Sequence, residues 1–401
     1  MPALVTLADV RDAAARVGPI LRATPVSRIE SVSRLCGIDV RLKEEQRQRT
    51  GSFKIRGAYN CISRLPAGSE VVAASAGNHG QGVALAASLC GLSSSIFMPS
   101  TASLPKVKAT QDYGATVQFV DGVIDDAVDA AKAFAKERGA VFVPPFDDPL
   151  VIAGQGTLAL ELAEDVPDAA TIVVPIGGGG LVAGIAGAYA ELMPSVRVIG
   201  VEAEGAAAMR ASLDAGEVRA LTSLATIADG IAVKSPSPLT LAHAQAFVAD
   251  VVTVSDAEIG EALVALLEYA KAVVEPSGAA GLAAVLAGKV QGPEPVVVVL
   301  SGGNVDSLLL AKLIEHGLSV TGRYLRLRID IPDRPGSLAA VTAMLAELGL
   351  NVLDVEHHRE GLATLGVDEV ELAVTVETRG LAHRDLCLKE MRRRGWSVRV
   401  D

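Results

Sequence analysis

The strongest constraint on the fold is a pattern that repeats up to about Val320: a short apolar run, a glycine-rich turn, then a helical stretch. Residues 71–75 precede AGNHGQG, residues 171–176 precede a run of glycines, and residues 295–300 precede SGGN. Strands this apolar are buried on both faces, as in a parallel sheet covered by helices. Ligands bind such sheets at the carboxyl ends of the strands, where all three turns lie. The sequence therefore predicts an α/β fold with its site at these turns.

The pattern changes after about Thr321. In YLRLRIDI, Leu325, Leu327, Ile329 and Ile331 alternate with polar residues, which predicts a strand with one solvated face. A helix, two strands, a helix and a final strand follow, so the order is that of a ferredoxin-like βαββαβ unit. We expect a catalytic domain at residues 1–318 and a second domain at 323–401, with the boundary near 317–323.

Composition excludes some classes of function. The 401-residue chain has a formal net charge of −11, which argues against nucleic-acid binding because neutralising phosphates requires a basic face. Its four cysteines are far apart, as expected of free thiols in a reducing compartment. Residues 171–190 are uncharged and about long enough to cross a bilayer, but Pro175 and four glycines interrupt them. We expect a soluble, cytoplasmic protein without a membrane span.

The glycine run predicts a phosphate site. It follows a strand and opens a helix, so its backbone amides can approach an anion closely, and the helix N-terminus favours negative charge. Two cofactor classes remain open. Gly178, Gly180 and Ala183 fit the loose dinucleotide pattern, and Glu202 lies where a ribose-binding acid would be. A tight turn that only allows helix–strand packing is the structural alternative.

Pyridoxal phosphate is the second class, and it requires a lysine, a phosphate site and partners for its ring. Lys54 follows the small-residue loop TGS, Asn78 lies in SAGNHG, and Ser301 begins SGGN. Each has an ordinary alternative: a solvated lysine, an Asx turn and a helix cap, respectively. A dinucleotide site, however, explains neither SFK nor SGGN, whereas a pyridoxal-phosphate site explains both.

Five segments occur in one order along the chain: SFKIRGA, ASAGNHGQG, the glycine run, EPSGAA and SGGN. In this the chain resembles the two-lobed, tryptophan-synthase-β-like (fold-type II) pyridoxal-phosphate enzymes. Within them it is most similar to the threonine dehydratase (threonine ammonia-lyase) family with one C-terminal ACT regulatory domain. The resemblance covers nearly the whole chain.

The resemblance implies roles for individual residues. Lys54 matches the Schiff-base lysine that later acts as acid and base, and Phe53 packs beside the ring. Asn78 would hydrogen-bond the ring hydroxyl, and Ser301 would face the pyridine nitrogen. The implied phosphate loop comprises Gly177, Gly178, Gly179, Gly180 and Leu181. The implied substrate-carboxylate loop comprises Ser75, Ala76, Gly77, Asn78 and His79. Glu275 lies in EPSGA at the edge of the pocket.

The implied reaction is deamination of L-threonine to 2-oxobutanoate and ammonium, and of L-serine to pyruvate. Serine racemase shares the scaffold, but it carries a serine immediately before GNHG, where this chain has Ala76. A non-catalytic amino-acid sensor is a further alternative, which the intact set of site residues disfavours. Several relatives bind a cation near the residue matching Glu202. This chain lacks the accompanying aspartate and has Ala206 and Ala208 instead, so no metal ligand is assigned.

The C-terminal unit resembles an ACT domain through DRPGSLA at residues 333–339 and through Asn351 after the first helix. The resemblance implies isoleucine as inhibitor and valine as activator, bound where two such units meet. An oligomerisation module without a ligand is the alternative. Exposed strand edges favour pairing in both cases, so we expect a homodimer or homotetramer.

Overall fold

The computed structural model describes residues 2–358 and 368–400. The chain forms two compact units, Met1–Ser307 and Leu308–Asp401. Helix α13 (Ser307–Val320) belongs almost entirely to the second unit, whereas the sequence placed residues up to 318 in the first. Glu315 of α13 forms an ion pair with Arg326, 3.5 Å away in the same unit. Of the expected domains, residues 1, 359–367 and 401 lie outside the described residues.

The first unit contains two sheets, and the larger has the strand order β1-β2-β10-β7-β8-β9. Its strands are β1 (Val26–Arg28), β2 (Val40–Lys43), β10 (Val296–Val299), β7 (Thr171–Pro175), β8 (Arg197–Ala203) and β9 (Asp250–Val254). All neighbours are parallel except β1, which pairs antiparallel with β2 at the edge. Every residue of β7 and β10 is buried, as predicted for strands covered on both faces.

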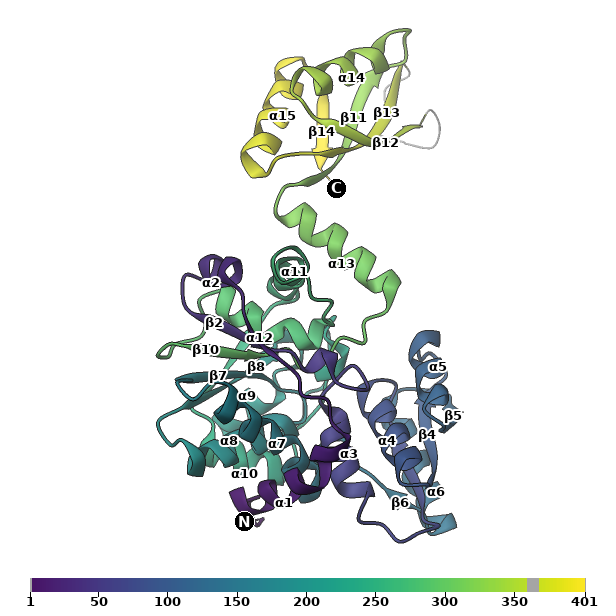
Figure 1. The fold of residues 1–401 in the computed structure, drawn as a ribbon. Helices are drawn as coiled ribbons and strands as arrows, with labels where there is room; N and C mark the ends of the chain where they lie inside the picture. The colour runs from purple at the N-terminus through teal and green to yellow at the C-terminus, as the bar shows by residue number, and fades with distance from the viewer. Residues whose placement is uncertain (1, 359–367, 401) are drawn as a thin grey trace. The chain divides into compact units, whose positions relative to one another are not determined.

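The smaller sheet forms a second lobe, with the order β5-β4-β3-β6 and only parallel neighbours. Its strands are β5 (Thr116–Val120), β4 (Ser93–Pro99), β3 (Glu70–Ala74) and β6 (Val141–Phe142). The helices nearest to this sheet are α4 (Asn78–Leu89), α5 (Leu104–Asp112) and α6 (Ile124–Arg138) (Figure 1). The two-lobed α/β architecture expected from the sequence is confirmed.

The larger lobe carries most of the remaining helices (Figure 1). They are α1 (Leu7–Val17), α2 (Glu30–Cys36), α7 (Pro149–Asp165), α8 (Gly180–Leu192), α9 (Ala208–Ala215), α10 (Pro238–Phe247), α11 (Asp256–Ala265) and α12 (Pro276–Leu286). Helix α3 (Lys54–Ile62) buries its apolar residues in the core of the smaller lobe. Helices α7 and α8 pack with their backbones almost touching. A Cβ on Gly184 would lie 2.4 Å from the carbonyl oxygen of Ile152. The glycine and alanine content of the chain is therefore used for close helix packing.

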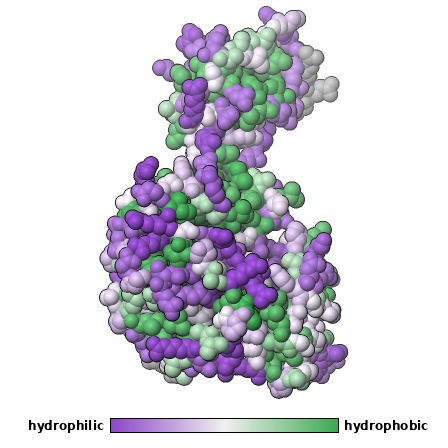
Figure 2. Space-filling model, in the orientation of Figure 1, coloured by the Kyte–Doolittle hydropathy of each residue, from purple (hydrophilic) through white to green (hydrophobic). Residues whose placement is uncertain are grey.

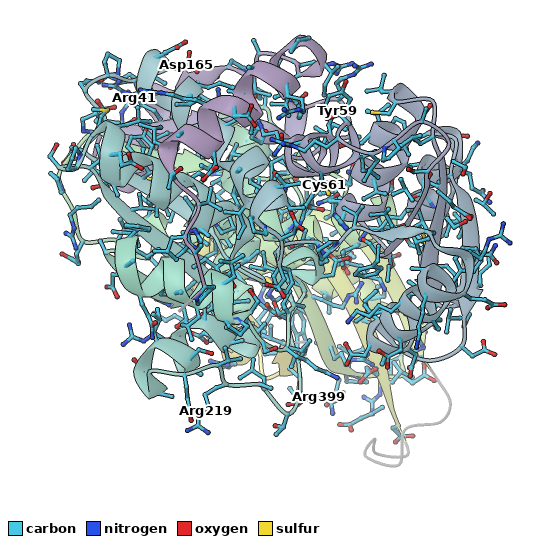
Figure 3. The ribbon with its side chains drawn as sticks, turned by 90° about the horizontal axis from the view of Figure 1, so that it is seen from below. Arg41, Tyr59, Cys61, Asp165, Arg219 and Arg399 are labelled. Carbon is cyan, nitrogen blue, oxygen red and sulfur yellow. The ribbon has the colours of Figure 1, made fainter. Side chains whose placement is uncertain are left out.

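A buried network of ion pairs connects strand β2 of the larger lobe to helices α3 and α7. Arg56 of α3 is fully buried, and its guanidinium lies 2.8 Å from Glu45 and 2.6 Å from Glu161. Lys43 of β2 reaches Glu161 at 2.9 Å and Asp165 at 3.0 Å. Asp165 is the last residue of α7, and Figure 3 labels it in the same region of the molecule as Arg41 of β2. Burial disfavours the charged form of Arg56, but Glu45 and Glu161 outweigh it and raise its pKa.

Arg56→Met is expected to lower the free energy of unfolding by about 3–5 kcal/mol, because it leaves the fully buried Glu45 carboxylate without its partner. Urea unfolding monitored by circular dichroism measures the loss. The matched control is Arg138→Met, whose partner Glu70 lies 3.0 Å away in an exposed pair. That change should cost less than about 1 kcal/mol. Equal costs for the two variants would contradict the assignment of Arg56 as the centre of a buried network.

The second unit has an antiparallel sheet with the order β12-β13-β11-β14. Its elements are β11 (Tyr324–Pro332), α14 (Ser337–Glu347), β12 (Asn351–His358), β13 (Glu369–Glu377), α15 (Leu381–Arg393) and β14 (Ser397–Val400). The alternating residues Leu325, Leu327, Ile329 and Ile331 are all buried in its core. The predicted βαββαβ order is confirmed.

The uncharged stretch 171–190 forms β7, a loop and most of α8 rather than one long helix. Within residues 2–358 and 368–400, no helix is both long enough and apolar enough to cross a membrane. Figure 2 shows hydrophilic areas interspersed with smaller hydrophobic areas on the visible face of the Met1–Ser307 unit.

Candidate active site

A cavity of about 290 Å³ in the first unit gathers the predicted site residues. It lies where β3, β7 and β10 end, so residues from both lobes line it. The predicted residues along its wall are Phe53, Lys54, Ser75, Ala76, Gly77, Asn78, His79, Gly177, Gly178, Gly179, Gly180, Leu181 and Ser301. Glu275 lines it as well. Five motifs that are distant in the sequence therefore share one cavity.

The loop before Lys54 is held by the SGGN turn. Gly51 has a φ of +70°, and a Cβ there would lie 2.4 Å from Oδ1 of Asn304. Ser52 pairs with Gly302 as an isolated β-bridge, and the backbone amide of Phe53 donates to the carbonyl oxygen of Ser301 at 3.2 Å. These contacts place Lys54 at the first position of α3, beside the end of β10.

The environment of Lys54 favours an amine that can lose its proton. Nζ donates to the carbonyl oxygen of Pro145 at 3.0 Å and lies 5.2 Å from the ring centroid of Phe53. Burial lowers the pKa of Lys54 to about 8, although the charge of Glu275 opposes this shift. A buried lysine with a depressed pKa is a usable nucleophile and proton acceptor near neutral pH.

The glycine run forms a cradle with no room for side chains. A Cβ on Gly178 would lie 2.1 Å from the ring of Phe146, and Gly179 has a φ of +91°. Gly180 begins α8, and Gly179 before it has no side chain that could cap the helix. The first amides of α8 can therefore receive an anion, which fits the phosphate group of a cofactor. The cavity thus combines an anion cradle with a lysine amine, two of the three features that pyridoxal phosphate requires.

Three amide and carboxyl groups form a chain of hydrogen bonds at the cavity wall. Nδ2 of Asn304 donates to Oδ1 of Asn78 at 2.8 Å and to the carbonyl oxygen of Thr50 at 2.7 Å. Nδ2 of Asn78 donates to Oε1 of Glu275 at 2.5 Å. Burial and, second to it, the charge of Asp229 raise the pKa of Glu275 to about 7, against the hydrogen bond from Asn78 and the charges of Lys106 and Lys54. The site therefore contains a buried carboxyl group that titrates near neutral pH.

His79 has a structural environment. Its Nε2 lies 2.9 Å from the carbonyl oxygen of Val143, and the side chain is buried. Burial and the nearby charge of Lys54 lower the pKa of His79 to about 3, so the imidazole is neutral at working pH. Nε2 then carries the hydrogen that is donated to Val143. Among the predicted loop residues, the hydroxyl of Ser75 accepts from the amide of Gly77 at 3.1 Å.

Several further residues line the cavity without a signal in the sequence. They are Lys106, Ile124, Pro145, Phe146, Asp229, Ile231, Val233 and Ser277. Lys106 of α5 and Asp229 of the turn η4 (Asp229–Ile231) form an ion pair that joins the two lobes. None of these residues stands in a glycine-rich turn after a strand, which was the signal used. Only the FDD sequence after Pro145 could have indicated a turn near the site.

Glu202 has a role in the structure that needs neither a ribose nor a cation. Its carboxylate is fully buried and accepts the backbone amides of Met209 and Arg210, each at 2.8 Å, at the start of α9. Burial raises its pKa to about 7, while these hydrogen bonds act in the opposite direction. Within the described residues, no group of three or more His, Cys, Asp or Glu side chains is arranged to hold a metal ion.

The fold and the cavity together define a two-lobed α/β enzyme class that binds an anionic cofactor near a reactive lysine. Comparison with known proteins gives the family. The model of the pyridoxal-phosphate dependent enzymes matches residues 17–302, and that of the ACT domain matches residues 325–386. The chain belongs to the pyridoxal-phosphate dependent enzyme family and carries a C-terminal ACT domain. The cofactor is thus pyridoxal phosphate, and the dinucleotide interpretation of the glycine run is not needed.

Individual relatives cover most of the chain. An L-threonine ammonia-lyase from Thermotoga maritima is 41% identical over 401 residues, with 99% of this chain and 100% of that protein aligned. Among solved structures, maize serine racemase is 37% identical with a TM-score of 0.75, covering 79% of this chain and 99% of that one. The threonine deaminase isoform 2 from Solanum lycopersicum is 34% identical with a TM-score of 0.74, and the match covers 78% of this chain and 95% of that one.

Proposed function

We propose that this enzyme deaminates L-threonine to 2-oxobutanoate and ammonium, and that it also converts L-serine to pyruvate. The observation that carries the proposal is the 41% identity to an L-threonine ammonia-lyase over both domains. The arrangement of Lys54 and the glycine cradle in one cavity supplies the groups that such a reaction needs.

Each role below belongs to this proposal. When bound, pyridoxal phosphate supplies a conjugated ring that withdraws electrons from the α-carbon of an attached amino acid. Lys54 binds the cofactor and afterwards accepts the α-proton, for which its lowered pKa is suited. Ser301 would stand on the side of the ring nitrogen, where a hydroxyl would not hold that nitrogen protonated as a carboxylate would.

The remaining roles concern binding. The amides of residues 177–181 would hold the phosphate, Phe53 would pack beside the ring, and Asn78 would donate to the ring hydroxyl. The amides of residues 75–79 receive the substrate carboxylate. Phe146 packs against Gly178 and narrows the cavity on the phosphate side.

Serine racemase is the second candidate, and the similarity to the maize enzyme favours it. A racemase needs a second acid/base group on the opposite face of the substrate. Ala76 lines the cavity at the loop position where the sequence comparison places the serine of racemases, and its methyl group cannot carry a proton. For this reason we favour deamination over racemisation.

We also propose that the ACT domain makes the enzyme responsive to a branched-chain amino acid, with isoleucine as inhibitor and valine as activator. The match of residues 325–386 to the ACT family supports this. A homodimer or homotetramer would bring two such domains together. The four free cysteines, Cys36, Cys61, Cys90 and Cys387, are consistent with a reducing cytoplasm.

The holoenzyme is expected to release 2-oxobutanoate from L-threonine and pyruvate from L-serine when the two substrates are assayed side by side. One methyl group distinguishes them, so their kcat/KM values should differ by no more than about 200-fold. Chiral chromatography of the remaining amino acid should show no D-isomer. Titration with isoleucine and valine follows, with alanine as the control effector. Racemised amino acid without oxo acid would overturn deamination in favour of the second candidate.

A further inference from the structure

Glu275 immediately precedes α12 and occupies its N-cap position. An acidic side chain at this position normally caps the helix. Such a carboxylate accepts amides of the first turn. Here the backbone carbonyl oxygen of Glu275 accepts the amides of Gly278 and Ala279, at 2.9 and 3.1 Å, and its side chain makes no capping hydrogen bond. The carboxyl group points instead to the cavity wall and accepts from Asn78. The carboxyl group of Glu275 is therefore not used to cap the helix and is available for a role in the site.

Neighbouring glycines make room for this carboxyl group. A Cβ on Gly302 would lie 2.2 Å from Oε1 of Glu275 and 3.0 Å from Nδ2 of Asn78. A Cβ on Gly230 would lie 2.8 Å from Oγ of Ser277, in the first turn of the same helix. The second position of SGGN must therefore be glycine for Glu275 and Asn78 to meet. The contact is built into two motifs from opposite ends of the unit.

The hydrogen-bond chain gives the amide of Asn78 one orientation. Its oxygen accepts from Asn304, so its nitrogen faces Glu275. An amide nitrogen has two hydrogens, and Glu275 takes one of them. The other remains for a group in the cavity. Because Asn304 also donates to the carbonyl oxygen of Thr50, the same chain reaches the loop that carries Lys54.

Charges from three further elements act on Glu275. Lys54 of α3 and Lys106 of α5 favour its ionised form, while Asp229 of η4 disfavours it. In return, the charge of Glu275 favours the protonated form of Lys54. Asp229 and Lys106 pair with each other, so their effects largely offset. Lys106 acts on Glu275 more strongly than Lys54 does, but Lys54 is the cation whose own pKa the charge of Glu275 raises in return.

We propose that Glu275 is a positioning residue whose carboxyl group orients the amide of Asn78 and whose charge acts on Lys54. The proposal deepens the function given above and rests on it only for the effect on turnover. A group with this role holds the cofactor-binding amide in place without touching the reacting atoms. It also links the two sides of the cavity electrostatically.

The decisive experiment measures Lys54 in the cofactor-free protein. The pH dependence of reductive methylation at Lys54, followed by mass spectrometry of its peptide, gives the pKa of the amine. Glu275→Gln should lower that midpoint by about one pH unit, because a nearby negative charge is lost. Glu202→Gln is the matched control. Glu202 is also buried with a raised pKa, but it does not line the cavity and should leave the midpoint unchanged.

A second measurement uses the holoenzyme. Since the pKa of Glu275 lies near 7, wild-type kcat/KM should fall as pH decreases through that value. In Glu275→Gln this acid limb should disappear, with kcat reduced about tenfold to hundredfold and the cofactor still bound. Glu275→Asp retains the charge and should preserve the Lys54 midpoint even if Glu275→Gln does not fold.

The outcomes separate this inference from the proposed function. An unchanged Lys54 midpoint in Glu275→Gln, or an equal shift in Glu202→Gln, overturns the role of Glu275. If only Glu275→Asp folds, a midpoint shifted downward by a full pH unit in that variant overturns it too. A shifted midpoint in an enzyme that releases no oxo acid retains the role and rejects threonine deamination.

Discussion

Lys54→Ala is expected to reduce oxo-acid release from L-threonine by at least about a thousandfold, because the variant loses both the cofactor attachment and the proton acceptor. The purified variant should also lack the visible absorbance of the bound cofactor. A fixed-time assay of 2-oxobutanoate measures the loss of turnover, and an absorbance spectrum measures the loss of bound cofactor. Among the described residues that line the cavity, no other amine is held against a backbone carbonyl, as Nζ is against Pro145.

Two controls test whether the loss of activity is specific to the amine of Lys54. Lys136→Ala removes an exposed lysine of α6 and should leave turnover and absorbance as in wild type. A small added amine should restore part of the activity of Lys54→Ala by replacing the missing proton acceptor. Normal turnover of Lys54→Ala without added amine would exclude the proposed role of Lys54.

Gly178→Ala is expected to weaken cofactor binding at least about hundredfold, since its Cβ would lie 2.1 Å from the Phe146 ring inside the phosphate cradle. Equilibrium dialysis against pyridoxal phosphate measures the loss. The double variant Gly178→Ala/Phe146→Ala should recover part of the affinity, because the smaller side chain leaves room for the methyl group. Recovery would identify the steric conflict as the cause.

Gly187→Ala is the matched control on the same helix α8. A Cβ there meets nothing closer than the carbonyl oxygen of Val5 at 3.4 Å. Alanine is also the better helix former, so this variant should be as stable as wild type or more so, with unchanged cofactor affinity. If Gly187→Ala and Gly178→Ala lose affinity equally, the cradle is not responsible.

Each lobe supplies a different set of residues to the cavity. The smaller lobe supplies the loop of residues 75–79 and Lys106, and the larger lobe supplies the glycine cradle, Glu275 and Ser301. Lys54 lies on α3, directly after the loop that pairs with the SGGN turn of the larger lobe. A change in the separation of the lobes would therefore alter how Asn78 meets Glu275, which makes that hydrogen bond sensitive to the state of the whole unit.

The sequence by itself determined the fold class and most of the cavity wall. Strands such as β7 and β10 are apolar throughout because both faces are covered, and this signal is local. The alternation of Leu325, Leu327, Ile329 and Ile331 is equally local, and all four residues are buried. Lys54, Asn78, the glycine run and Ser301 could be found because each stands in a short turn after a strand or before a helix, whereas the resemblance to the family supplied Phe53, Leu181 and the other residues of the substrate-carboxylate loop.

Only the tertiary structure decided which other residues face the cavity and what the buried acids do. Phe146, Lys106 and Asp229 reach the site from segments without a motif, since their positions depend on how two lobes pack. Glu202 and Glu275 both stand near strand or helix ends, yet one caps α9 and the other turns into the cavity. The assignment of α13 to the second unit follows for the same reason. Burial, ion pairing and pKa arise from contacts between distant segments, which a local pattern does not contain.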